Sequence, residues 1–188
     1  MPRIPIVPTI LVLAAVGVMI WLGFWQLRRL DEKESLLAHY AAAQTMSTEV
    51  AWPKGEAAEK DMLYRHARID CVGVTNRSSM AGRNAGGESG MAQTAECQLG
   101  DGSQALVVLG WSRLPMAAGT WNGGTLHGVI APGPRLVAVP AVAGLEANAI
   151  PDPSEIPNNH FAYAVQWFFF AATALVIYAL ALMKRGKK

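Results

Sequence analysis

The sequence predicts a membrane protein with both α and β structure, in which two transmembrane helices flank a small antiparallel β-sheet or barrel-like extramembrane domain. Two long apolar stretches without charged residues, 4–27 and 161–183, predict the helices. Each is long enough to cross a bilayer core, which takes about 20 apolar residues at a rise of about 1.5 Å each. Short strand-like runs separated by glycine and proline predict the domain between them.

The first helix, with an extension outside the membrane, is expected over residues 4–43. Leu27, Leu30 and Leu37 continue a helical spacing beyond the apolar stretch, which indicates that the helix outlasts the membrane core and frays near Gln44. A cleaved signal peptide is the alternative, because Arg3 precedes the apolar run. The length of the run, and the two arginines that follow it in place of a small-residue cleavage site, favour a membrane span.

Residues 44–157 are expected to form the β-rich domain, which we place in the periplasm. Five short runs have strand character, namely 63–74, 93–99, 104–109, 125–130 and 136–139. Turn signals stand at 121–124 and 132–134, and the glycines between 82 and 90 indicate a flexible loop between the first two strands. Several short strands with turns between them are typical of a small antiparallel sheet or barrel.

The second transmembrane helix is expected over residues 158–183, with a basic cytoplasmic tail at 184–188. A proline-rich connector precedes it, and Asn158 or Asn159 is expected to cap it. Lysine and arginine near the span ends predict the orientation. Three such residues follow the first span, whereas five lie at the chain ends: Arg3, Lys184, Arg185, Lys187 and Lys188. Both termini are therefore expected in the cytoplasm, or in the matrix for a mitochondrial protein.

Composition and motifs exclude several function classes. The net charge of +2 is too small, and basic residues too scattered, to predict a nucleic-acid partner. The run 110–114 lacks the final glycine of a nucleophile elbow, and no phosphate-binding loop or His-Glu-x-x-His motif occurs. The sequence therefore predicts no enzyme. Cys71 and Cys97 allow either a disulfide or two buried thiols.

His160 has a special position, since it falls in the first turn of the second membrane helix. His160, Tyr163, Ala164 and Trp167 share one face of that helix, and the small Ala164 is expected to leave a shallow groove between aromatic rings. A helix N-terminus favours neutral imidazole, which is the form that ligates metals. A flat apolar ring with a central iron would fit there; the alternative is a histidine that anchors the helix at the lipid headgroups.

A second cluster ends the first span. Trp25, Arg29 and Lys33 align at intervals of four residues, with their charges just outside the hydrocarbon. Snorkelling to lipid phosphates is one interpretation. The other is recognition of a specific anion such as a haem propionate. Gln26, beside them, is expected to bond to the partner helix or to a ligand.

These two clusters carry a resemblance. Gly23-x-Trp25-Gln26-x-x-Arg29-x-x-x-Lys33 after a first span, and His160-x-x-Tyr163-Ala164-x-x-Trp167-Phe168 at the start of a second, resemble the Surfeit-locus family (Shy-type) of cytochrome c oxidase assembly factors. Gly110-Trp111 also resembles a glycine-tryptophan pair in the middle of that family. Leu109 and Gln166 depart from it, standing where arginine and threonine are usual.

The resemblance implies an assembly factor, or chaperone, in the bacterial inner membrane that assists haem a delivery or insertion into oxidase subunit I. His160 is the iron ligand that it implies. From the residues we add that Tyr163, Trp167 and Trp25 contact the macrocycle and that Arg29 and Lys33 meet the propionates. The expected partners are subunit I, other oxidase assembly factors and the lipid bilayer. The alternative is a structural or interaction subunit of the oxidase without a cofactor.

Overall fold

The computed structural model describes residues 5–115 and 121–185 of the chain. The expected helix start at residue 4, and Arg3, Lys187 and Lys188 of the orientation argument, lie outside these residues. The chain forms two compact units. One comprises Met1–Leu37 and Pro157–Lys188, and the other is Ala38–Ile156.

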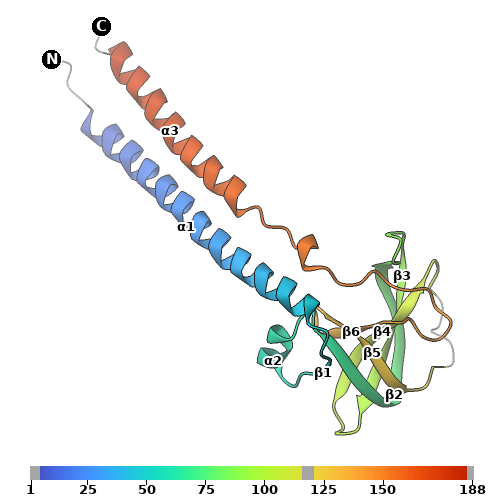
Figure 1. Cartoon of the computed structure of the whole chain (residues 1–188). Coiled ribbons are helices and arrows are strands. Elements are labelled where there is room, and N and C mark those ends of the chain that lie inside the picture. The colour runs from blue at the N-terminus through green and yellow to red at the C-terminus, as the bar shows by residue number, and fades with distance from the viewer. Residues whose placement is uncertain (1–4, 116–120, 186–188) are drawn as a thin grey trace. The chain divides into compact units, whose positions relative to one another are not determined.

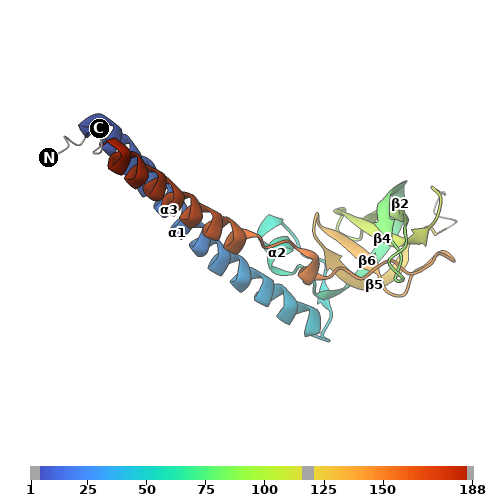
Figure 2. The same ribbon diagram turned by 90° about the horizontal axis from the view of Figure 1, so that it is seen from above.

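The first unit is a pair of antiparallel helices, α1 (Ile6–Thr45) and α3 (His160–Arg185), which run side by side in both views (Figures 1 and 2). Side chains of reduced exposure recur along them at spacings of three and four residues. On α1 these include Thr9, Val12, Val16, Met19, Gly23 and Gln26, and on α3 they include His160, Ala164, Trp167, Ala171, Ala174 and Tyr178. This 3.5-residue repeat keeps one seam of each helix facing its partner.

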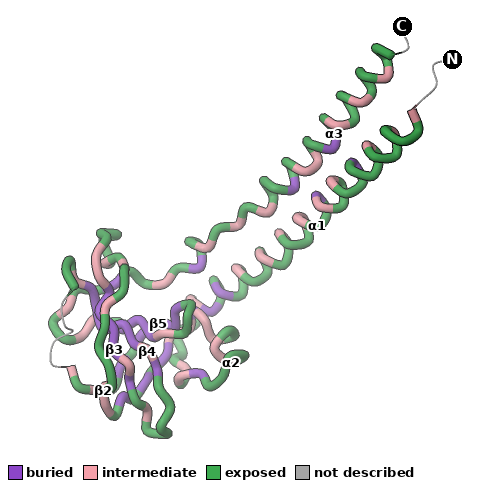
Figure 3. The backbone as a smooth tube through the Cα atoms, turned by 180° about the vertical axis from the view of Figure 1, so that it is seen from behind, coloured by how far each residue is buried: buried purple, intermediate pink, exposed green. Residues whose placement is uncertain are grey.

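Outside the seam, the apolar side chains of both helices are exposed. Only 11% of the most apolar part of α1, and 6% of the most apolar part of the segment that contains α3, is buried. In Figure 3 the tube of both helices is accordingly mostly green, for exposed, with pink between. The core helix of a soluble protein would bury most of such a surface, because exposing it to water is costly. Both helices are long and apolar enough to span a membrane.

The second unit is built around a closed barrel of five strands. Its elements are β1 (Val50–Ala51), α2 (Glu56–Asp61), β2 (His66–Arg83), β3 (Ser89–Leu99), β4 (Gln104–Ser112), β5 (Gly124–Ala131), β6 (Arg135–Ala138) and the 3-10 turn η1 (Pro153–Glu155). Neighbouring strands follow the order β2-β3-β4-β6-β5, and β5 pairs with β2 to close the ring. The last residues of α1 belong to this unit, where Tyr40 packs on Tyr64 with ring centroids 5.0 Å apart.

Of the two forms that the sequence allowed, the domain takes the barrel-like one, and its sheet is mixed, because β4 pairs with β6 in parallel, and so does β1 with β2. A closed ring of five strands cannot alternate direction throughout, since an odd number forces at least one parallel pair. The chain provides that pair by placing β6, the hairpin partner of β5, between β5 and β4. The general prediction of two apolar helices and a small β domain is confirmed.

All five strand-like runs of the sequence are strands, but the first two are longer than expected. The glycine-rich segment between them is a tight hairpin rather than a flexible loop, with Gly82 paired to Gly90. Asn84 organises its turn, because its side-chain oxygen accepts hydrogen bonds from the amides of Gly86 (3.0 Å) and Glu88 (2.9 Å). Asparagine side chains commonly stabilise turns in this way.

The barrel interior holds the hydrophobic core of the second unit. Its fully buried members include Ala67, Ile69, Val107, Leu109, Ile130 and Leu136, shown in purple in Figure 3. Cys71 of β2 and Cys97 of β3 join there in a disulfide with their Cα atoms 5.4 Å apart. Of the two states that the sequence left open, the structure contains the bridged one.

Candidate functional site

The two sequence clusters meet across the helix pair. A nitrogen of His160, the Nδ1 atom, lies 2.7 Å from the side-chain oxygen of Gln26. His160 is the first residue of α3, whereas Gln26 lies midway along α1. The expected contact between the two helices, and the expected bond of Gln26 to the partner helix, are both confirmed.

Close packing beside this hydrogen bond depends on a glycine. A Cβ atom on Gly23 would lie 2.6 Å from the Phe168 ring, which is closer than real contacts allow. The same ring meets Phe24 edge-on, with centroids 5.4 Å apart. Small residues at a helix seam permit such an approach in the membrane, where packing rather than the hydrophobic effect holds helices together.

The shallow groove expected at Ala164 does not exist, because Ala164 is 1% exposed. Its small side chain serves the seam: it lies seven residues before Ala171, which is also buried. The sequence also predicts that the two spans pack together, with Gly23 and Ala164 permitting their close approach, and this prediction is confirmed. In the helix pair, the part of the α3 face that includes Ala164 is taken up by packing between the helices, which leaves no open space there.

The other proposed ligand-binding side chains differ in exposure and in their partners. Trp25 is 39% exposed and Tyr163 is 49% exposed. Arg29 forms an ion pair with Glu32, one turn further along α1, at 2.5 Å. Trp167 is half-buried and meets Phe170 of its own helix edge-on. Lys33 is also half-buried, so the structure leaves the roles of all five as predictions.

A polar contact that the sequence analysis missed lies near the other end of the pair. The hydroxyls of Thr9 on α1 and Tyr178 on α3 are 2.5 Å apart. Thr9 precedes Val16 by seven residues, as Tyr178 follows Ala171 by seven. The 3.5-residue repeat through Gly23 and Ala164 would have identified both as seam positions. Together with His160–Gln26, this bond fixes the register of the two helices at both ends.

Replacing Gly23 by leucine is expected to loosen the helix pair. The added side chain would collide with the Phe168 ring, and overpacking of this kind typically costs about 1–3 kcal/mol. The thermal unfolding midpoint of the full chain in detergent measures the effect. Gly17→Leu is the matched control, since a Cβ there meets nothing within 4 Å. Equal midpoints for the two variants would contradict the close approach, and Phe168→Ala should partly rescue Gly23→Leu.

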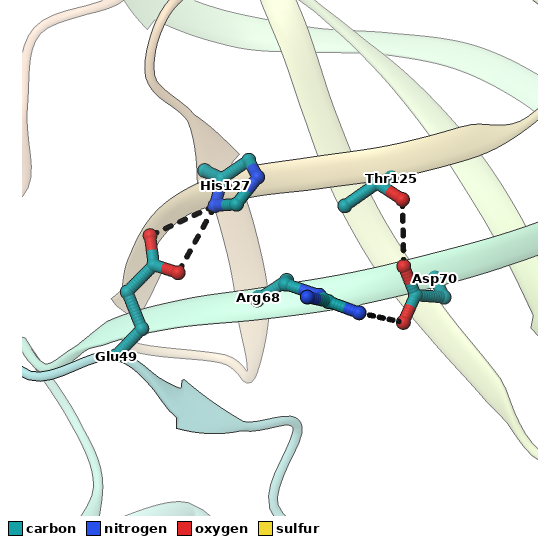
Figure 4. A network of polar contacts seen from close by, with 5 residues as sticks. All are labelled: Glu49, Arg68, Asp70, Thr125 and His127. Atoms are coloured by element: carbon teal, nitrogen blue, oxygen red, sulfur yellow. Dashed lines mark hydrogen bonds and ion pairs between the residues drawn. The ribbon is translucent and has the colours of Figure 1, made fainter.

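A separate polar network lies on the outer face of the barrel (Figure 4). His127 Nδ1 is 2.8 Å from a carboxylate oxygen of Glu49. Arg68 donates to Asp70 at 2.9 Å, and the Thr125 hydroxyl donates to the same carboxylate at 2.7 Å. Two hydrogen bonds lower the pKa of Asp70: the one from Thr125 has the larger effect and the one from Arg68 the smaller. All these groups are partly solvated and mutually paired, so the network ties β2, β5 and the segment before β1 together without offering a free acid or base.

The remaining histidines give no second site. Among residues 5–115 and 121–185, no group of three or more His, Cys, Asp or Glu side chains could hold a metal ion. His39 contacts the end of α2 through Asp61, at 3.3 Å from its carbonyl oxygen.

The fold and site thus define a class: a protein of two membrane-compatible helices and a small mixed barrel, with a paired histidine where the second helix begins. The model of the SURF1 family matches residues 13–172, which include most of α1, the whole barrel and the first half of α3. The chain therefore belongs to the SURF1 family. No curated protein matches it. The family is one of cytochrome oxidase assembly factors rather than of catalytic enzymes, as the sequence predicted.

Proposed function

We propose that this protein holds haem a during the assembly of cytochrome c oxidase subunit I, with His160 as the iron ligand. The single observation that supports this role most is the 2.7 Å contact between His160 Nδ1 and Gln26. It engages one ring nitrogen with a protein acceptor and leaves Nε2 for another partner. Histidines that ligate metals almost always have their second nitrogen paired in this manner.

The residues around His160 fit the chemistry of a haem. When bound, haem a would supply an iron atom that accepts a nitrogen ligand, which His160 would provide, and two carboxylates that need cationic partners. Trp25, Tyr163 and Trp167 present apolar ring surface for its macrocycle. Arg29 and Lys33 supply the positive charge for the propionates.

Arg29 is already paired, but its partner can be exchanged at small cost. Its side chain is 51% exposed and that of Glu32 is 62% exposed, and exposed ion pairs contribute only about 0–1 kcal/mol. A charge-assisted hydrogen bond to a propionate in a less solvated place contributes about 1.5–3 kcal/mol. Arg29 would therefore be able to leave Glu32 and hold a propionate at small cost.

The same proposal places the barrel in the periplasm and both ends of the chain in the cytoplasm of a bacterial inner membrane. The Cys71–Cys97 disulfide supports this orientation, because disulfides persist in oxidising compartments. Lys184 and Arg185 at the end of α3 support it as well, because basic residues concentrate on the cytoplasmic side. Haem transfer then involves subunit I and other assembly factors in the same bilayer.

The test is the haem content of protein purified from cells that make haem a. We expect His160→Ala to lower bound haem by about tenfold or more, since loss of about 1.4 kcal/mol already gives that factor. His127→Ala is the control, as this histidine lies on the barrel and pairs with Glu49. Equal haem content in wild type and His160→Ala would overturn the ligand assignment. A protein that carries no haem and co-purifies with mature oxidase would instead be an interaction subunit.

A further inference from the structure

We infer that Gln26 is a positioning residue that holds the His160 proton on Nδ1 and keeps Nε2 available as an electron-pair donor. The purpose of this arrangement rests on the proposed function, but the arrangement itself concerns only residues of this chain. The carbonyl oxygen of the Gln26 side chain lies 2.7 Å from Nδ1. That distance is typical of a hydrogen bond.

The inference follows from the donors and acceptors of the two groups. A neutral imidazole carries a proton on one nitrogen and a lone pair on the other, and an amide oxygen is an acceptor only. Contact between the Gln26 oxygen and Nδ1 therefore requires that Nδ1 carries the proton and donates it. Nε2 then has the lone pair, which is the state a metal ion needs. If the Gln26 amide were reversed, its NH₂ group would donate to Nδ1 and the proton would move to Nε2, where it would block ligation.

Two rigid elements hold this bond in place. Gln26 lies three residues after Gly23 on the seam of α1, at the point where the Phe168 ring packs against that glycine. His160 is the first residue of α3 and is half-buried. A hydrogen bond between two packed helices fixes the direction of the imidazole ring as well as its proton. Sites supported in this way are more precise than sites on loops.

The first experiment reads the tautomer directly in the haem-free full-length protein in detergent. Nitrogen-15 NMR of labelled histidine distinguishes a protonated nitrogen from one with a lone pair. In the wild type we expect the His160 proton on Nδ1. In Gln26→Leu, which removes the acceptor at similar size, we expect the Nε2-protonated form to predominate. Gln166→Leu is the matched control, because Gln166 is an exposed glutamine further along α3, and it should leave the His160 signals unchanged.

The second experiment measures affinity for iron-porphyrin. Loss of the partner that orients a ligating histidine typically costs about 10–100-fold in affinity, so Gln26→Leu should weaken binding by this factor while His160 still ligates the iron. Gln26→Glu retains an acceptor for Nδ1 and should restore most of the affinity. The unfolding midpoint of each variant shows that the helix pair is intact.

The outcomes separate this inference from the proposed function. A wild-type His160 with its proton on Nε2, or an unchanged tautomer in Gln26→Leu, would overturn the role of Gln26 even if His160→Ala loses its haem. If the tautomer responds as expected while His160→Ala keeps its haem, the inference stands and the proposed haem ligand fails.

Discussion

Gly128→Ala is expected to unfold the barrel or to destabilise it by about 3 kcal/mol or more, at the upper end of typical overpacking effects. Gly128 lies in β5 between its two neighbours, pairing with Ala67 on β2 and Ala138 on β6. A Cβ atom there would lie 2.1 Å from the backbone oxygen of Val137. A backbone atom cannot rotate away as a side chain can, so relief requires that β6 moves and that β5–β6 hydrogen bonds weaken.

Urea unfolding of the full chain in detergent, followed by the circular dichroism of the strands, measures this change. Gly73→Ala is the matched control. Gly73 is likewise a strand residue, in β2 and paired with β3, but a Cβ atom there meets none of the described residues within 4 Å. We expect Gly73→Ala to change the free energy of unfolding by less than about 0.5 kcal/mol, as surface substitutions usually do. Similar urea unfolding curves for the two alanine variants would show that the β6 backbone does not lie so close to Gly128.

Trp111→Ala is expected to cost about 3–5 kcal/mol, the range for removing a buried tryptophan. Trp111 of β4 is 1% exposed. Its ring lies directly over Gly90, where a Cβ atom would come within 2.3 Å of it. Its backbone exchanges hydrogen bonds of 2.7 and 3.1 Å with Glu146. The preceding residue, Gly110, leaves room for Leu145, whose Cβ would be 2.3 Å from an added methyl group.

Trp111→Phe distinguishes ring packing from the indole N–H. Within residues 5–115 and 121–185, the buried Trp111 Nε1 atom has no hydrogen-bond partner, and an unsatisfied buried donor costs about 1–3 kcal/mol. Phenylalanine keeps most of the ring and removes that donor, so its net cost should be well below that of alanine. The same urea experiment compares the two. A phenylalanine variant as unstable as the alanine variant would mean that the indole nitrogen contributes a bond to water or to the chain.

The structure also explains the glycine-tryptophan pair that the sequence singled out. The pair resembles a feature of the SURF1 family, but its spacing alone gave no reason for it. In the barrel, Gly110 admits the returning segment at Leu145, and Trp111 bonds to Glu146 in that segment while covering Gly90. The two residues therefore dock the chain that leaves β6 onto the far end of β4. This is a packing role.

Patterns within short stretches of the sequence were sufficient to predict the two long helices and the five barrel strands. Apolar runs without charges predicted the two helices, since a span needs many successive apolar residues. Short strand-like runs and the turn residues between them predicted all five barrel strands, since both depend on neighbours in the sequence. The glycines at 82–90 were misjudged because glycine occurs in loops and also where strands approach closely. Only the cross-strand contact of Gly82 with Ala92 separates the two cases.

By itself, the sequence determined that two apolar helices flank a small β domain along the chain and that His160 lies in the first turn of the second helix. The tertiary structure decided that the partner of Gln26 is His160, 134 residues further along the chain, and that the barrel closes through one parallel strand pair. The physical reason is that helix and strand periodicity are set within a few residues along the chain. Which face of a helix or strand contacts which other element depends instead on close packing between segments that are distant in the sequence. In the sequence, the sign of this packing is small residues at the right spacing.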